Sequence, residues 1–79
     1  MKNIFSEVLN QPYFDNGAVV NCNISDEECE LQITMPDSKI LLQISNKIVS
    51  VEDKVNAYHK LQVIKNAIDE LLFEIAKKL

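Results

Sequence analysis

Alternating hydrophobic and polar positions mark three strands in the middle of the chain. The apolar positions, each two residues from the next, are Val20, Cys22 and Ile24; then Cys29, Leu31, Ile33 and Met35; then Ile40, Leu42 and Ile44. Alternation with a period of two is typical of strands that turn one face to a core. Acidic residues at 26–28 and the sequence Pro36-Asp37-Ser38 interrupt the pattern, so we expect turns there. The segment is therefore predicted to be a three-stranded antiparallel meander.

The two turns also predict the register of this meander. The expected partners are Val20 and Ile33, Cys22 and Leu31, and Ile24 and Cys29 across the first turn, and Met35 and Ile40, Ile33 and Leu42, and Leu31 and Ile44 across the second. Both turns place the large apolar side chains on one face, and a slip by one residue would expose them. The opposite face then presents a row of Asn21, Gln32 and Gln43 beside a row of Val19, Thr34 and Leu41.

Apolar residues at helical spacing flank the meander on its N-terminal side. Ile4, Phe5, Val8 and Leu9 predict a short helix over residues 2–10. Pro12 ends it, because the residue before a proline disfavours the helical conformation. Asp15-Asn16-Gly17 follows, and its Asn-Gly pair accepts positive φ at little cost, which predicts a turn.

A second, much longer helix is predicted from residue 51 to about residue 78. Ser50 and Asp53 resemble a capping box at its start. Its apolar residues form one stripe, namely Ala57, Leu61, Ile64, Ile68, Leu71, Leu72, Ile75 and Leu79. At about 1.5 Å per residue the helix is about 40 Å long, more than the width of a compact domain of this size. Either it breaks, or its end overhangs the domain and contacts a partner.

These elements predict one domain, residues 1–79, of the α+β class. Its order is α-β-β-β-α in two layers, with the short N-terminal and the long C-terminal helix on one face of the sheet. This order resembles that of double-stranded RNA-binding domains, which carry a lysine-rich segment at the start of the second helix to bind phosphates. Here that place reads Val51-Glu52-Asp53-Lys54, which has the wrong charge for such a role.

Composition and charge argue against nucleic acid and membrane as partners. The 79 residues carry a net charge of −4, and all eight basic residues are lysines, whereas arginine is the usual bidentate reader of phosphates and guanines. We see no signal-peptide pattern at the start and no run of about 18 apolar residues, and two cysteines are too few for a disulfide scaffold. A reduced, cytoplasmic protein is expected. The frequent Asn, Ile and Lys suggest an AT-rich bacterial or phage genome.

No constellation for catalysis, cofactor binding or metal binding stands out. The single histidine, His59, falls opposite the apolar stripe, and one glycine is too few for a phosphate-binding loop. Cys22 and Cys29 lack the two further ligands of a zinc site, so we read them as small inward hydrophobic residues. The chain is therefore predicted to be no enzyme and to need no cofactor.

Elimination favours a protein-binding module: a small regulator, inhibitor or adaptor, homodimeric through the C-terminal helix. A phage- or plasmid-encoded inhibitor of a host enzyme would suit this size and acidity. The candidate contacts are Val63 and Phe73, which lie off the stripe, and the acidic cluster of Asp26, Glu27, Glu28 and Glu30. The alternative is a small-ligand or nucleotide-binding protein that uses a dimer groove or the neutral sheet face of Asn21, Gln32, Gln43, Thr34 and Leu41.

Overall fold

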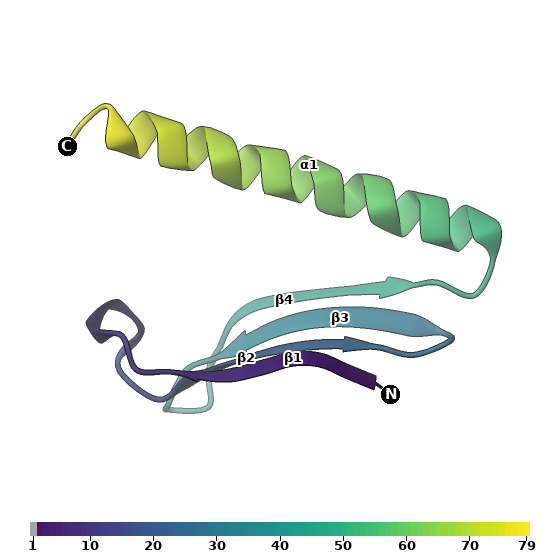
Figure 1. The fold of residues 1–79 in the computed structure, drawn as a ribbon, viewed down its shortest axis with the longest axis horizontal. Coiled ribbons are helices and arrows are strands. Elements are labelled where there is room, and N and C mark those ends of the chain that lie inside the picture. Colours follow the sequence, from purple (N-terminus) through teal and green to yellow (C-terminus); the bar gives the residue numbers. More distant parts are fainter. Residues whose placement is uncertain (1) are drawn as a thin grey trace.

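A four-stranded antiparallel sheet followed by one long helix makes up the protein in a computed structural model, which describes residues 2–79 (Figure 1). The elements are β1 (Lys2–Leu9), the short 3-10 helix η1 (Pro12–Phe14), β2 (Ala18–Ile24), β3 (Glu28–Thr34), β4 (Ile40–Lys47) and α1 (Val51–Ala76). The strands lie in the order β1-β2-β3-β4. The α+β class and the meander are confirmed, and the meander has one strand more than expected.

The prediction of an N-terminal helix over residues 2–10 is wrong, because this segment forms β1. It pairs antiparallel with β2, where Ser6 lies opposite Asn21 and Leu9 opposite Ala18. The register shifts between Asn3 and Phe5, so a bulge inserts one extra residue. The bulge explains part of the error, because it makes Ile4 and Phe5 neighbouring apolar residues. Val8 and Leu9 are also adjacent but lie on opposite faces of β1, and together the two pairs imitate helical spacing. The similarity in element order to double-stranded RNA-binding domains is lost with the helix.

The predicted register of the central strands is confirmed with one exception. Every expected pair between β2 and β3 is present, as are Ile33 with Leu42 and Leu31 with Ile44. Met35, however, does not pair with Ile40; Thr34 does, and the register shifts beside Ile33. Leu41 therefore does not lie opposite Thr34, and the expected row of Val19, Thr34 and Leu41 is wrong at its last member.

A three-residue turn causes this shift. The Met35 N–H donates to the Lys39 carbonyl at 2.8 Å, and the Ser38 N–H donates to the Met35 carbonyl at 2.9 Å. Ser38 has φ 71°, the left-handed conformation expected at the last position of such a turn. The turn is one residue shorter than predicted, so a bulge in β4 is needed before the alternation resumes.

The turn predicted at Asp15-Asn16-Gly17 is confirmed. These residues have φ of 54°, 27° and 104°, and the Gly17 N–H donates to the Leu9 carbonyl at 2.7 Å. Positive φ at three consecutive residues reverses the chain after η1 and directs it into β2. Asn and Gly tolerate this geometry better than other residues do.

The capping box at the start of α1 is also confirmed. The Asp53 N–H donates to Ser50 Oγ at 3.0 Å, and the Ser50 N–H donates to Asp53 Oδ2 at 3.2 Å. The backbone hydrogen bond from Ser50 is the largest of the causes that lower the pKa of Asp53 below 3.8. From this start α1 runs without a break to Ala76. Of the two expectations for the long helix, a break is therefore wrong.

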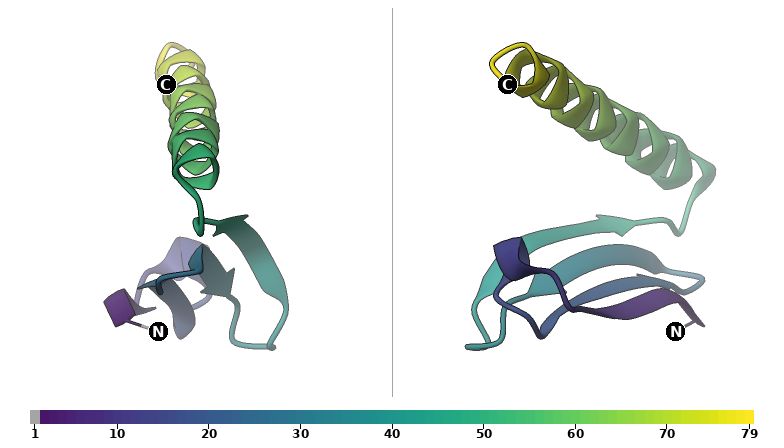
Figure 2. Two further views of the ribbon diagram at one scale, coloured as in Figure 1. Left: turned by 90° about the vertical axis from the view of Figure 1, so that its right-hand side faces the viewer. Right: turned by 60° about the vertical axis from the view of Figure 1, so that its left-hand side comes forward.

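The core of a single copy is thin. Among the described residues only Ala18 and Ala57 are fully buried. Figure 2 shows why: a single helix forms the whole second layer, and it lies chiefly over β4. The radius of gyration is 14.7 Å, whereas a compact domain of this length would have about 11.6 Å. The apolar face of the sheet is thus only partly covered.

Candidate functional site: an apolar groove between helix and sheet

An open groove separates α1 from the apolar face of the sheet. It consists of two hollows of about 370 and 220 Å³ that share Leu31, Ile44 and Leu61, and so form one groove. All four strands and α1 line it; its main apolar residues are Ile4, Ile24, Leu31, Ile44, Leu61 and Ile68. The two free thiols, Cys22 and Cys29, also line it and are half-buried. We call this site the apolar groove.

The apolar stripe of α1 becomes more exposed along the helix. Ala57 is buried, and Leu61 is 38% and Ile68 48% exposed. Leu71 is 65% exposed, and Leu72 and Ile75 are similarly open. Figure 1 shows the reason, because the helix rises away from the sheet toward its C-terminus. The stripe therefore has a first half that faces the chain's own sheet and a second half, from Leu71 on, that lies farther from the sheet and is more than half exposed.

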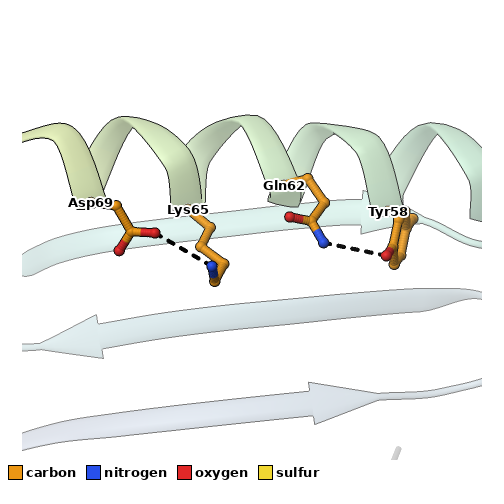
Figure 3. A network of polar contacts seen from close by, with 4 residues as sticks. All are labelled: Tyr58, Gln62, Lys65 and Asp69. Carbon is orange, nitrogen blue, oxygen red and sulfur yellow. Dashed lines mark hydrogen bonds and ion pairs between the residues drawn. The ribbon is translucent and has the colours of Figure 1, made fainter.

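Polar side chains follow one flank of α1 beside the groove (Figure 3). Gln62 Nε2 donates to Tyr58 Oη at 3.3 Å, and Lys65 Nζ lies 3.4 Å from Asp69 Oδ2. Both contacts join residues four apart, a spacing that stabilises an isolated helix by about 0.2–0.5 kcal/mol per pair. Both contacts join residues of α1 and neither reaches the sheet. They therefore stabilise the helical conformation of α1, which packs only sparsely on the sheet.

The opposite face of the sheet carries one polar row whose side chains bond to one another. The next row on this face is mostly apolar, with Val8, Val19, Thr34 and Ile40 paired in turn. The expected row of Asn21, Gln32 and Gln43 is confirmed by the register, and β1 adds Ser6 to it. Ser6 Oγ donates to Asn21 Oδ1 at 2.8 Å, and Gln43 Nε2 donates to Glu30 Oε2 at 3.5 Å. The main hollows of the described chain are lined by other residues than this row.

The structure divides the predicted acidic cluster in two. Asp26 and Glu27 lie at the exposed tip of the β2–β3 hairpin, where Ser25 Oγ accepts the N–H of Glu27 at 3.2 Å. Glu28 accepts from Ser45 Oγ at 3.3 Å, and Glu30 from Gln43. The tip is therefore a small acidic projection of two residues, while the other two acids belong to the polar sheet face.

Val63 and Phe73 do not form one surface. Both are exposed and lie off the stripe, but they are ten residues apart, about 15 Å along a helix. Lys77 Nζ lies 4.8 Å from the centre of the Phe73 ring and partly covers it. Val63 borders a shallow hollow together with His59 and Lys60. Each can offer only a small contact by itself.

Within residues 2–79, no group of three or more His, Cys, Asp or Glu side chains is placed to hold a metal ion. The ring centroids of His59 and Tyr58 lie 5.7 Å apart in a T-shaped arrangement. No helix in this part of the chain is both long enough and apolar enough to cross a bilayer. The lining of the apolar groove is mostly aliphatic, so this site suits apolar contact.

The sequence predicts the two apolar surfaces that line the groove, but it does not predict that they stand apart. The alternation of the strands and the stripe of α1 identify both apolar faces. Periodicity, however, says which side of an element is apolar and not how closely two elements pack. The available signal was the stripe's length, which exceeds what a sheet of strands of seven or eight residues can cover.

Comparison with known proteins finds no relative, so the functional argument depends on the geometry of the chain itself. No family model, no curated protein and no solved structure matches the chain.

Proposed function

We propose that this protein is a non-enzymatic protein-binding module, a small regulator or inhibitor, whose working form is a homodimer held by the C-terminal half of α1. The observation that carries the proposal is the exposed C-terminal half of the apolar stripe. Leu71, Leu72 and Ile75 are each more than half exposed in one copy. Several large apolar side chains in one strip of an α-helix favour burial against a second surface.

The surface area that one copy exposes is large enough for an interface between two copies. A compact protein of 9.0 kDa would expose about 4,850 Å², whereas one copy exposes 6191 Å². The excess, about 1,300 Å², is larger than the roughly 800 Å² that each partner loses in a standard interface. A domain with so small a core also gains stability when it self-associates. One interface between copies would thus bring the exposed area close to the normal range.

A protein partner beyond the second copy is proposed for the surfaces that the dimer leaves free. Glu28 and Glu30 lie on the polar sheet face, which such a dimer leaves exposed, and their charge favours a partner with a basic surface. A phage- or plasmid-encoded inhibitor of a host enzyme remains our specific proposal for this class. Phe73 and Val63 are the candidate apolar contacts for the same partner.

Native mass spectrometry of wild type and Leu72→Asp tests the dimer. We expect wild type to be a dimer and Leu72→Asp a monomer, because a carboxylate cannot be buried without a partner charge. Val63→Asp is the matched control: it is similarly exposed on another side of the same helix, and it should leave the dimer intact. Circular dichroism confirms that both variants keep their helix. A monomeric wild type, or a dimer that Leu72→Asp does not weaken, would contradict the proposal.

Small-ligand binding is the second candidate, and the polar sheet face gives it less support. Asn21 and Gln43 already bond to neighbouring side chains, so a ligand would have to replace those contacts. Within residues 2–79 the main hollows are lined by residues other than these candidates, whereas small-molecule sites are mostly concave.

A further inference from the structure

We propose that the apolar groove of each copy receives the C-terminal half of α1 from the other copy, running antiparallel to the resident helix. This inference rests on the proposed dimer and states what its interface is. The exchange is reciprocal, as in an isologous two-fold interface. The first half of the stripe packs on its own sheet and the second half on the sheet of the second copy.

The groove and the C-terminal half of the stripe both consist mainly of aliphatic side chains. One continuous stripe can therefore pack on the sheet of its own copy and on the sheet of the second copy. In one copy Leu61, Ile64 and Ile68 of α1 line the groove together with Leu31, Leu42 and Ile44 of the sheet. The C-terminal half continues the same stripe with Leu71, Leu72 and Ile75. Aliphatic side chains of similar size therefore face the groove from within the copy and are available from outside it.

The sheet is wide enough for a second helix. Strands lie about 4.8 Å apart, so the outer strands of a four-stranded sheet are about 14 Å apart. Helices pack at about 8–10 Å from one another. Since α1 lies chiefly over β4, the β1–β2 side of the apolar face has room for one further helix. Ile4, Phe5 and Leu9 on β1 border this side, and the first two are about half exposed.

Charge favours the antiparallel direction. The acidic hairpin tip lies beside the start of α1, because the Ile48 N–H donates to the Glu27 carbonyl at 2.8 Å. An antiparallel second helix ends at that place and brings Lys77 and Lys78 to Asp26 and Glu27. A parallel C-terminal half would instead end at the opposite end of the groove and leave Lys77 and Lys78 far from the acidic tip.

The two natural cysteines allow a direct test, because both line the groove and the chain has no others. Leu72→Cys and Ile75→Cys are prepared separately and oxidised under mild conditions. If the second helix lies in the groove, at least one of these thiols comes within the range of about 7 Å between Cα atoms that a disulfide can bridge. The same substitutions are made in a Cys22→Ala, Cys29→Ala background, and Val63→Cys serves as the off-groove control.

The inference is supported if Leu72→Cys or Ile75→Cys forms a covalent dimer on non-reducing gels. The yield should be at least ten times lower in the Cys22→Ala, Cys29→Ala background and with Val63→Cys. A covalent dimer that forms equally well in that background would overturn it, because the two helices would then meet each other outside the groove while the dimer stands. A wild-type monomer by native mass spectrometry would overturn the proposed function as well.

Thiol reactivity gives a second readout that needs no new cysteine. With the groove filled, Cys22 and Cys29 in wild type should react with a thiol reagent at least five times more slowly than in monomeric Leu72→Asp. Equal rates, with wild type shown to be dimeric, would place the interface elsewhere and overturn the inference. This comparison also covers the case in which the cysteine-free background fails to fold.

Discussion

Individual backbone conformations decide the turns of this sheet. Ser38 and Gly17 both have positive φ, of 71° and 104°, but only one of them is glycine. For a residue with a Cβ atom the left-handed region costs about 1–2 kcal/mol. Ser38 therefore carries strain that the turn requires, whereas Gly17 carries almost none.

Exchanging the residue type at these two positions should have opposite effects. We expect Ser38→Gly to stabilise the fold by roughly 0.5–1 kcal/mol, the relieved strain less the added freedom of the unfolded chain. Gly17→Ala should destabilise it by about 1 kcal/mol or more. The cause is backbone strain and not crowding, because an added Cβ would lie 3.7 Å from Pro36 Cγ. Urea unfolding measures both, and a loss of stability in Ser38→Gly would contradict this account of the turn.

Among the helices and strands, the sequence predicted correctly those features that depend only on neighbouring residues. The register of β2 with β3 and the start of α1 follow from period-two alternation and from Ser50 and Asp53. β1 was missed because the bulge at its start disturbs the alternation, and because strand pairing depends on a partner that local pattern does not show. The pairing of Met35 was missed because a serine, and not a glycine, takes the left-handed position at residue 38.

The capping box makes the start of α1 sensitive to acid. The pKa of Asp53 is lowered in the folded state by its hydrogen bond from the Ser50 N–H. A lowered pKa contributes stability that is present above the unfolded value of 3.8 and is lost as the pH falls through the folded value. We expect helix content, followed by circular dichroism, to fall as the pH drops below 3.8.

Two substitutions isolate this contribution. Asp53→Asn keeps an acceptor without the titrating proton, and its stability should depend less on pH between 2 and 4 than that of wild type. Ser50→Ala removes the reciprocal bond to the Asp53 N–H and should cost about 1 kcal/mol at neutral pH. An acid response of equal size in wild type and Asp53→Asn would assign the effect to other carboxylates.

At the scale of the whole molecule, uneven charge bears on how two copies meet. Residues 1–53 carry nine acids and three lysines, a net −6, and residues 54–79 carry three acids and five lysines, a net +2. An antiparallel exchange places the basic end of one helix at the acidic tip of the other copy. Opposite charges at that point direct the orientation more than they add affinity.

Charge reversal at both places should be compensatory. We expect Lys77→Glu with Lys78→Glu to weaken the dimer about fourfold or more, since each exposed ion pair contributes about 0.2–1 kcal/mol and both pairs occur twice in a reciprocal dimer. Adding Asp26→Lys and Glu27→Lys should restore affinity, and Lys60→Glu, which lies beside His59 and Val63 on α1, is the control for net charge. Sedimentation at low and high salt measures the effect, which salt should screen. If the second pair weakens the dimer further, the helix end does not lie at the tip.

The two register shifts also limit how the edges of the sheet can pair with other strands. Both fall in pairings made by the outer strands, β1 and β4, while the pairing of β2 with β3 is regular. Bulges, and charges such as Glu7 that project from an edge strand toward the apolar face, are devices that stop a sheet from adding strands without limit. β1 carries both devices, and β4 carries a bulge and ends in Lys47. Edge-to-edge growth into fibres is thereby disfavoured, and association is left to the helix and the sheet face, where it can close on itself after two copies.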